Sequence, residues 1–202
     1  MQLERLSGLE LGKLVNTKEI SPVEVWKYFT ERIESRNPSI NAFTYTKFEE
    51  AKQEAEKLES KIMKGENGGL FAGVPVGLKD FLPSKKGWTN SHGGVYSLIA
   101  VDDADSEFWK AASSMGAIAY GKTNAPAFGF SGACQNRMYG ATGNPFNPKL
   151  TSGGSSGGSA AAVSDGYIQK SDPRKSVTQG HEDKLHPRSR RRHPEISDTQ
   201  GT

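Results

Sequence analysis

Apolar residues recur at helical spacing near the start of the chain. In residues 21–36, SPVEVWKYFTERIESR, the apolar positions follow one another at steps of three or four residues: Val23, Trp26, Phe29 and Ile33. Such spacing gives one apolar stripe along a helix. Ser21 is a candidate N-cap and Pro22 suits the first helical position, so an amphipathic helix is predicted to begin here.

Strand-like and helix-like patterns alternate after this helix. Residues 40–46, INAFTYT, alternate as a short strand does, and residues 47–66 have the composition of a long, highly charged helix. A glycine-rich break precedes residues 74–81, VPVGLKDF, a short apolar run that ends in charge. Residues 105–123 then indicate a helix, a glycine stop and a buried strand. This alternation favours an α/β fold in which helices cover a sheet.

The pattern stops after Tyr167. The aliphatic residues of 168–202 show neither helical nor strand periodicity, and the segment holds eight Lys or Arg against five Asp or Glu. Because such a segment cannot bury enough apolar area to offset its ordering entropy, it is predicted to be a disordered basic tail. The sequence thus divides into a patterned part, 1–167, and a tail, 168–202.

Composition indicates in which cellular compartment the chain is expected. The single cysteine, Cys134, excludes an internal disulfide framework and suits a reducing compartment. No run approaches the roughly 18 apolar residues that span a bilayer, and the first residues lack the pattern of a signal peptide. We therefore expect a cytoplasmic chain that does not bind membranes.

Residues 151–163, TSGGSSGGSAAAV, allow two interpretations. A stretch of small residues can be a flexible linker, or a place where backbone approaches another group closely. It is not a phosphate-binding loop, because no Gly-Lys-Ser/Thr follows the glycines. Composition alone leaves both interpretations open.

The order of four segments supplies a resemblance. GVPVGLKD, then ADSEFWKAASSMGAIAYGKTNAPAFGF, then GATGNPFNP, then GGSSGGSAAAV resembles the amidase signature family. The resemblance runs from about residue 9 to about residue 167. It implies N-terminal helices followed by part of a mixed sheet, and hydrolysis of linear amide C–N bonds by a Ser–cis-Ser–Lys triad. It implies a small-molecule amide substrate, with no cofactor and no metal.

Two triad members match this sequence. On the resemblance, Lys79 matches the lysine that acts as base, and Ser155 matches the bridging serine, which follows a cis peptide bond. A buried lysine can act as a base because burial favours its neutral amine. We expect the Lys79 amine within hydrogen-bonding distance of the Ser155 hydroxyl. The alternative for Lys79 is a surface lysine paired with the neighbouring Asp80.

The third member, the nucleophile, has no match. In the resembling enzymes it lies in a Gly-Gly-Ser motif about two dozen residues after the bridging serine, and that motif also forms the oxyanion hole. No Gly-Gly-Ser follows Ser159 here, and Ser176, the nearest serine in spacing, lies between Lys175 and Val177. The chain alone is therefore expected to be inactive, as the product of a frameshifted or truncated gene.

Two other interpretations remain. One is a binding or regulatory protein whose RSRRRH segment, residues 188–193, contacts nucleic acid or another polyanion, although solvated disorder is favoured for that charge run. The other is catalysis through Cys134 as a surrogate nucleophile. The simpler interpretation of Cys134 is a small buried apolar residue.

Overall fold

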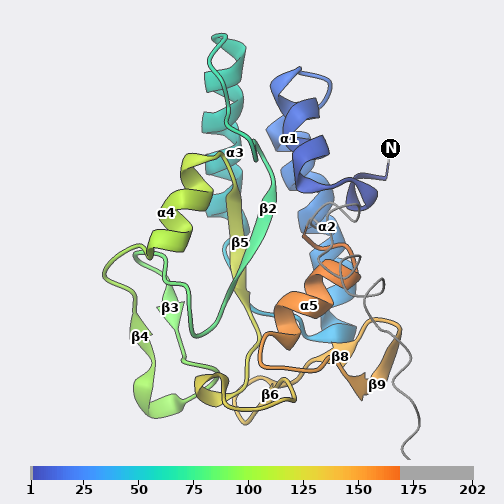
Figure 1. Ribbon diagram of the computed structural model, residues 1–202, viewed down its shortest axis with the longest axis vertical. Coiled ribbons are helices and arrows are strands. Elements are labelled where there is room, and N and C mark those ends of the chain that lie inside the picture. The colour runs from blue at the N-terminus through green and yellow to red at the C-terminus, as the bar shows by residue number, and fades with distance from the viewer. Residues whose placement is uncertain (1, 169–202) are drawn as a thin grey trace, which may run out of the picture.

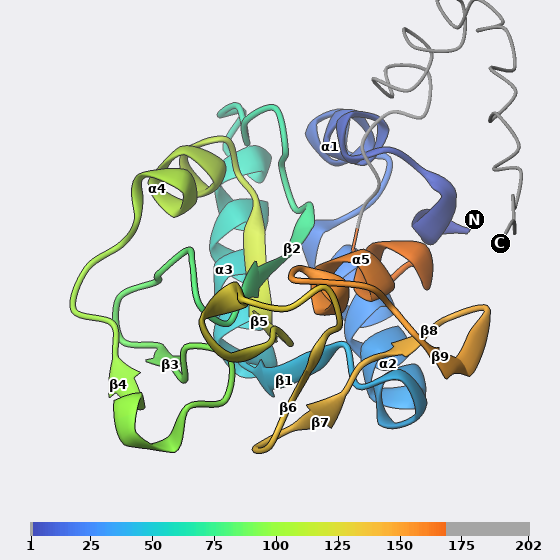
Figure 2. The ribbon, with the colours of Figure 1, turned by 60° about the horizontal axis from the view of Figure 1, so that its bottom comes forward.

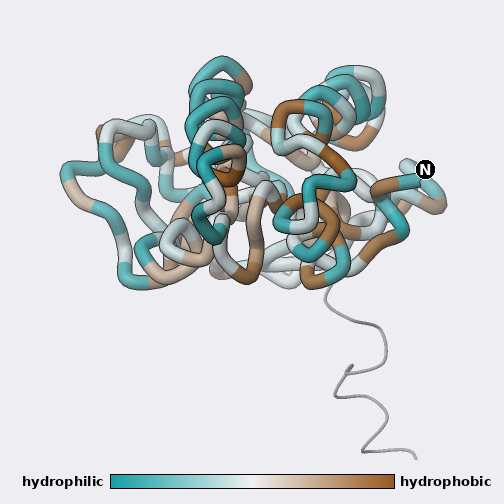
Figure 3. Tube along the Cα trace, turned by 90° about the horizontal axis from the view of Figure 1, so that it is seen from above, coloured by the Kyte–Doolittle hydropathy of each residue, from teal (hydrophilic) through white to brown (hydrophobic). Residues whose placement is uncertain are grey.

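The computed structural model describes residues 2–168, so all of the predicted tail except its first residue lies outside the described residues. Three helices come first: α1 (Gly8–Asn16), α2 (Pro22–Ile40) and α3 (Phe48–Met63). Figure 1 shows α1 and α2 to the right of β2 and β5, with α3 behind β5, and Figure 3 shows that most of α3 is hydrophilic. Ile168, which the sequence assigns to the tail, is buried in the core.

The predicted start of α2 is confirmed. The Ser21 hydroxyl accepts hydrogen bonds from the backbone N–H groups of Val23 and Glu24, and the Glu24 carboxylate accepts one from the Ser21 N–H. Pro22 occupies the first turn, where its missing N–H leaves no bond unmade. This reciprocal capping box fixes where the helix begins.

The buried stripe of α2 differs in part from the predicted one. Phe29 and Ile33 are buried as expected, but the third fully buried position of this stripe is Val25, whereas Val23 and Trp26 are only partly buried. Val25, Phe29 and Ile33 follow one another at four-residue steps, which place them on one face of a helix. Trp26 turns instead toward α3, where its indole N–H donates to the Phe48 carbonyl at 2.9 Å.

A mixed three-stranded sheet lies beside these helices. Its order is β1 (Phe43–Thr46), β5 (Ile118–Thr123) and β2 (Pro75–Lys79). The pairing of β1 with β5 is antiparallel, and that of β2 with β5 is parallel and sets Lys79 opposite Thr123. Every residue of β5 is buried, as expected for a central strand covered on both faces. The predicted α/β class and mixed sheet are thus confirmed.

The two faces of the sheet pack against different parts of the chain. Ile118 and Tyr120 of β5 contribute to the core that the N-terminal helices form. Ala119, on the opposite face, packs with Leu78, Trp88 and Trp109. Trp109 belongs to α4 (Glu107–Ser114), which therefore covers the second face of the sheet.

The long excursion between β2 and β5 is attached to α3 through Lys85. It contains α4 and a short ribbon, β3 (Thr89–Asn90) with β4 (Ala100–Val101). The Lys85 amine lies 2.9 Å from a Glu50 oxygen and 2.7 Å from a Glu54 oxygen. Its two other neighbours are aromatic: the Trp88 ring centroid at 4.6 Å and the Trp109 ring centroid at 4.9 Å.

The last part of the described chain crosses the carboxyl ends of β2 and β5. Two small ribbons come first, formed by β6 (Gln135–Asn136), β7 (Gly140–Ala141), β8 (Gly143–Asn144) and β9 (Asn147–Thr151). Helix α5 (Gly157–Ser164) follows them, and Figure 2 shows it next to α2. Three short 3₁₀ turns complete the elements: η1 (Leu3–Arg5), η2 (Tyr96–Leu98) and η3 (Ala127–Gly129). Within residues 2–168, no helix has the length and apolar character that a bilayer crossing requires.

Candidate functional site

Lys79 and Ser155 meet where the two parallel strands end. Lys79 is the last residue of β2, and Ser155 lies in the loop before α5, 76 residues further along the chain. The Lys79 Nζ donates to the Ser155 Oγ at 2.7 Å. The peptide bond between Gly154 and Ser155 is cis. The structure therefore brings together the two residues that the sequence singles out.

Close backbone contacts explain why the serine loop consists of small residues. A Cβ on Gly154 would lie 2.7 Å from the Ser131 carbonyl oxygen, and one on Gly158 would lie 2.5 Å from the Asn124 carbonyl oxygen. Both distances are below normal contact, so a side chain at either place would displace backbone. The Gly158 N–H also donates to the Asn124 carbonyl, which anchors the start of α5 at the end of β5. The linker interpretation of this stretch is therefore wrong.

The Lys79 amine is partly withdrawn from solvent. Burial lowers the pKa of Lys79 below its ordinary value of 10.5, and a smaller opposing effect comes from the thiol of Cys134. Within residues 2–168, Lys79 forms no ion pair with a carboxylate. Asp80 is not its partner, because the Asp80 carboxylate is buried and accepts hydrogen bonds from Ser91. This environment favours the neutral amine.

Cys134 lies behind the serine loop. It is buried, its Sγ donates to the Asn124 carbonyl at 3.2 Å, and a Cβ on Gly157 would lie 3.3 Å from that sulfur. The thiol therefore packs against the backbone at the start of α5. This is the small buried residue of the simpler interpretation.

Two polar pairs beside Lys79 and Ser155 have no signal in the sequence pattern. The Thr123 and Ser159 hydroxyls lie 2.6 Å apart and join the end of β5 to α5. Asp80 accepts from both the backbone N–H and the hydroxyl of Ser91. Each pair joins residues that lie apart in the sequence, so periodicity does not indicate them.

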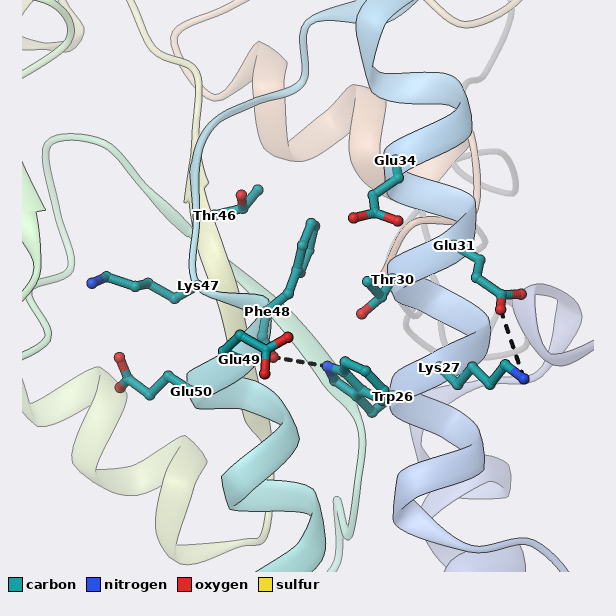
Figure 4. Close-up of a pocket in the computed structure, with 10 residues that line it drawn as sticks. All are labelled: Trp26, Lys27, Thr30, Glu31, Glu34, Thr46, Lys47, Phe48, Glu49 and Glu50. Carbon is teal, nitrogen blue, oxygen red and sulfur yellow. Dashed lines mark hydrogen bonds and ion pairs between the residues drawn. The ribbon is translucent and has the colours of Figure 1, made fainter.

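A hollow elsewhere on the surface is unrelated to this pair. A groove of about 650 Å³ lies between α2 and the start of α3, and Figure 4 shows the residues that line it. Four glutamates, two lysines, Trp26 and Phe48 are among them, but Lys79 and Ser155 are not. In the part of the chain that the structure describes, no group of three or more His, Cys, Asp or Glu side chains could hold a metal ion.

The fold and the site define a class: α/β proteins with a half-buried lysine and a serine joined at the carboxyl ends of parallel strands. The family model described as Amidase matches residues 24–170. The chain therefore belongs to the amidase family.

Curated relatives agree with this family. The chain is 36% identical over 163 residues to a glutamyl-tRNA(Gln) amidotransferase subunit of Clostridium botulinum (strain Alaska E43 / Type E3), in an alignment that covers 81% of this chain and 33% of that protein. It is 34% identical over 165 residues to a lipoamidase of Enterococcus faecalis, covering 82% of this chain and 22% of that protein. The chain thus spans a third or less of these two relatives.

Solved structures agree in fold. A bacterial aryl acylamidase of the amidase signature family is 39% identical with a TM-score of 0.77, over 81% of this chain and 34% of that one. A fatty acid amide hydrolase is 29% identical with a TM-score of 0.78, over 82% of this chain and 29% of that one.

Proposed function

We propose that this chain provides the base and the bridging serine of an amide-hydrolysing site that acts on small linear amides. In this proposal Lys79 is the general base and Ser155 passes protons between Lys79 and a nucleophile. The observation that supports it most directly is the 2.7 Å contact between the Lys79 Nζ and the Ser155 Oγ, formed by an amine whose pKa burial lowers.

The chemistry follows from these two groups. A serine hydroxyl attacks an amide carbonyl only when its proton is removed, and a neutral amine can accept that proton. Ser155, whose hydroxyl both donates and accepts, can take the proton from a nucleophile while giving its own to Lys79. The same route in reverse returns a proton to the leaving amine, and water then hydrolyses the acyl intermediate.

We further propose that these 202 residues alone hydrolyse no amide. No Gly-Gly-Ser follows Ser159, so neither a matched nucleophile nor the backbone N–H donors of an oxyanion hole are supplied. The loss of a single oxyanion donor costs roughly 2.7–4 kcal/mol of transition-state stabilisation. Without a nucleophile, Lys79 and Ser155 have no hydroxyl from which to remove a proton, and without an oxyanion hole the transition state is not stabilised.

A chimera tests the two assigned roles. Residues 2–168 replace the matching third of the aryl acylamidase, which is 39% identical over this region. The chimera is expected to hydrolyse an anilide substrate of that enzyme, and K79A and S155A are each expected to reduce kcat by at least a hundredfold, the usual scale for general-base loss. Ser164→Ala, an exposed change at the end of α5, is the matched control and should retain activity.

The isolated chain gives the second test. Assays against a panel of simple amides and esters should give background rates for the chain and for K79A alike. Turnover that K79A abolishes would contradict the proposed inactivity, and a chimera whose activity does not depend on Lys79 would contradict the proposed base.

A further inference from the structure

The chain turns sharply after Lys79, and a buried carboxylate holds the turn. The exposed fraction of Asp80 is 2% and that of Ser91 is 1%. The Ser91 backbone N–H donates to Asp80 Oδ1 at 2.9 Å, and the Ser91 hydroxyl donates to Asp80 Oδ2. Within residues 2–168, Asp80 forms no ion pair, so these hydrogen bonds are what satisfies its charge.

Ser91 extends this contact into the next segment. Its hydroxyl oxygen accepts from the Gly94 N–H at 2.8 Å, which closes the turn of residues 91–94. Inside that turn, the His92 carbonyl accepts from the Phe128 N–H at 2.9 Å. The turn that Asp80 holds is thereby joined to residues 126–129, which we call the amine wall.

One residue of the amine wall, Gly129, lies near the Lys79 amine. A Cβ on Gly129 would lie 3.7 Å from the Lys79 Nζ and 3.5 Å from the Phe81 ring. Gly129 has a φ of +71° and the preceding Phe128 a φ of +53°, both in the left-handed region. The backbone at Gly129 therefore lies near both the Lys79 amine and the Phe81 ring.

We propose that Asp80 and Ser91 are positioning residues for Lys79, and that their hydrogen bonds hold the amine wall against its side chain. This inference rests on the proposed function, because it concerns the surroundings of Lys79 as the proposed base. Asp80 and Ser91 act through the amine wall and not on a reacting atom. Their loss is expected to admit water to the Lys79 amine.

Nearby charges do not account for the lowered pKa of Lys79. Asp80 follows the end of β2, and its carboxylate accepts hydrogen bonds from Ser91 and not from the Lys79 amine. Within residues 2–168, Cys134 is the other titratable group that affects the pKa of Lys79, and its effect opposes the lowering by burial. Removing the neutral Ser91 hydroxyl therefore tests the wall without changing any charge.

The experiment measures the protonation of Lys79 directly. The full chain is labelled with ¹³C-lysine, the Cε shift of each lysine is followed against pH, and the Lys79 signal is identified by its loss in K79R. In the S91A variant, the midpoint of Lys79 is expected to rise by at least half a pH unit toward 10.5. S91C, which retains a weak donor of similar size, is expected to give a smaller shift in the same direction and replaces S91A if that variant does not fold.

Ser7→Ala is the matched control. Ser7 is also a buried serine, the N-cap of α1, so its loss destabilises the chain but should leave the Lys79 midpoint unchanged. An unchanged midpoint in folded S91A and S91C would overturn the inference. Because the readout is a titration of this chain and not turnover, an active chimera that does not depend on Lys79, together with a shifted midpoint, would refute the proposed base and leave the proposed positioning role in place.

Discussion

Three lysines next to the sheet differ in the groups that contact their amines. Lys85 lies between two carboxylates and two indole rings. Lys122, fully buried, donates to the Pro83 carbonyl at 3.0 Å and lies 3.2 Å from an Asp102 oxygen. Within the described residues, the Lys79 amine bonds to a serine hydroxyl and to no carboxylate. Of the three, and within the described residues, Lys79 is therefore the lysine without a carboxylate partner.

The stability of the chain should depend on pH through Lys79. Because the folded pKa is below the unfolded value of 10.5, the unfolded chain holds more protons between these two values. The free energy of unfolding that Lys79 contributes therefore rises with pH across this window and falls as pH drops through the folded pKa. Urea unfolding of the wild type and of K79M over this range should show the wild type gaining on the variant as pH increases.

K79R supplies the comparison for that measurement. Arginine stays protonated over the same range, so the difference between the wild type and K79R should rise with pH in the same way. A difference that stays flat from about pH 7 to pH 10.5 would show that burial does not perturb Lys79.

At the scale of elements, α5 is fastened to α2 at its far end. The Arg36 guanidinium makes two hydrogen bonds to the Asp165 carboxylate, at 2.7 and 2.6 Å, and Arg32 donates twice to the Asp165 backbone carbonyl. The exposed side-chain fraction is 7% for Asp165 but 46% for Arg36. The contact fixes the helix whose first turn follows Ser155.

Removing Arg36 and removing Asp165 should reduce the free energy of unfolding by different amounts. Arg36→Ala leaves a buried carboxylate without its cation and is expected to reduce the free energy of unfolding by roughly 3 kcal/mol. Asp165→Ala leaves a half-exposed guanidinium that water can reach, so a smaller loss of about 2 kcal/mol is expected. Urea denaturation measures both, and equal or reversed losses would contradict the burial argument.

The longer elements could be predicted because their causes are local. The cap of α2, the charged face of α3 and the apolar β5 each lie within a few residues of sequence. The predicted stripe of α2 was partly wrong because contact with α3, not spacing alone, decides where Trp26 turns. The four short strands β6 to β9 were not predicted, since they pair over two to five residues and have no apolar periodicity.

The site was less accessible to such reasoning. Nothing in the residues around Lys79 indicates a partner 76 positions away, and only the family resemblance paired it with Ser155. The approach of Gly129 to the amine was not predicted, because residues 126–129 are joined to the turn at Ser91 only in the folded chain. Contacts of this kind depend on the tertiary arrangement.

At the scale of the molecule, the chain corresponds to about a third of the clostridial amidotransferase protein that it resembles. The match to the family model ends at residue 170, close to Tyr167, where the sequence pattern stops. We expect that the coding DNA beyond codon 167, read in one of the other two frames, encodes an apolar strand followed by Gly-Gly-Ser and an arginine. Translation of both frames tests this, and the absence of that motif from each would favour a tail of independent origin.

The separations along the chain have a consequence for the order of events during synthesis. Arg36 contacts a residue 129 positions later, and Lys79 contacts one 76 positions later. Contacts that close long loops form late, because the entropy of closure is lost before the contact stabilises anything. During synthesis, Arg36 therefore cannot form its ion pair with Asp165 until the ribosome has passed residue 165. Lys79 likewise cannot contact Ser155 until residue 155 has been made, shortly before Asp165.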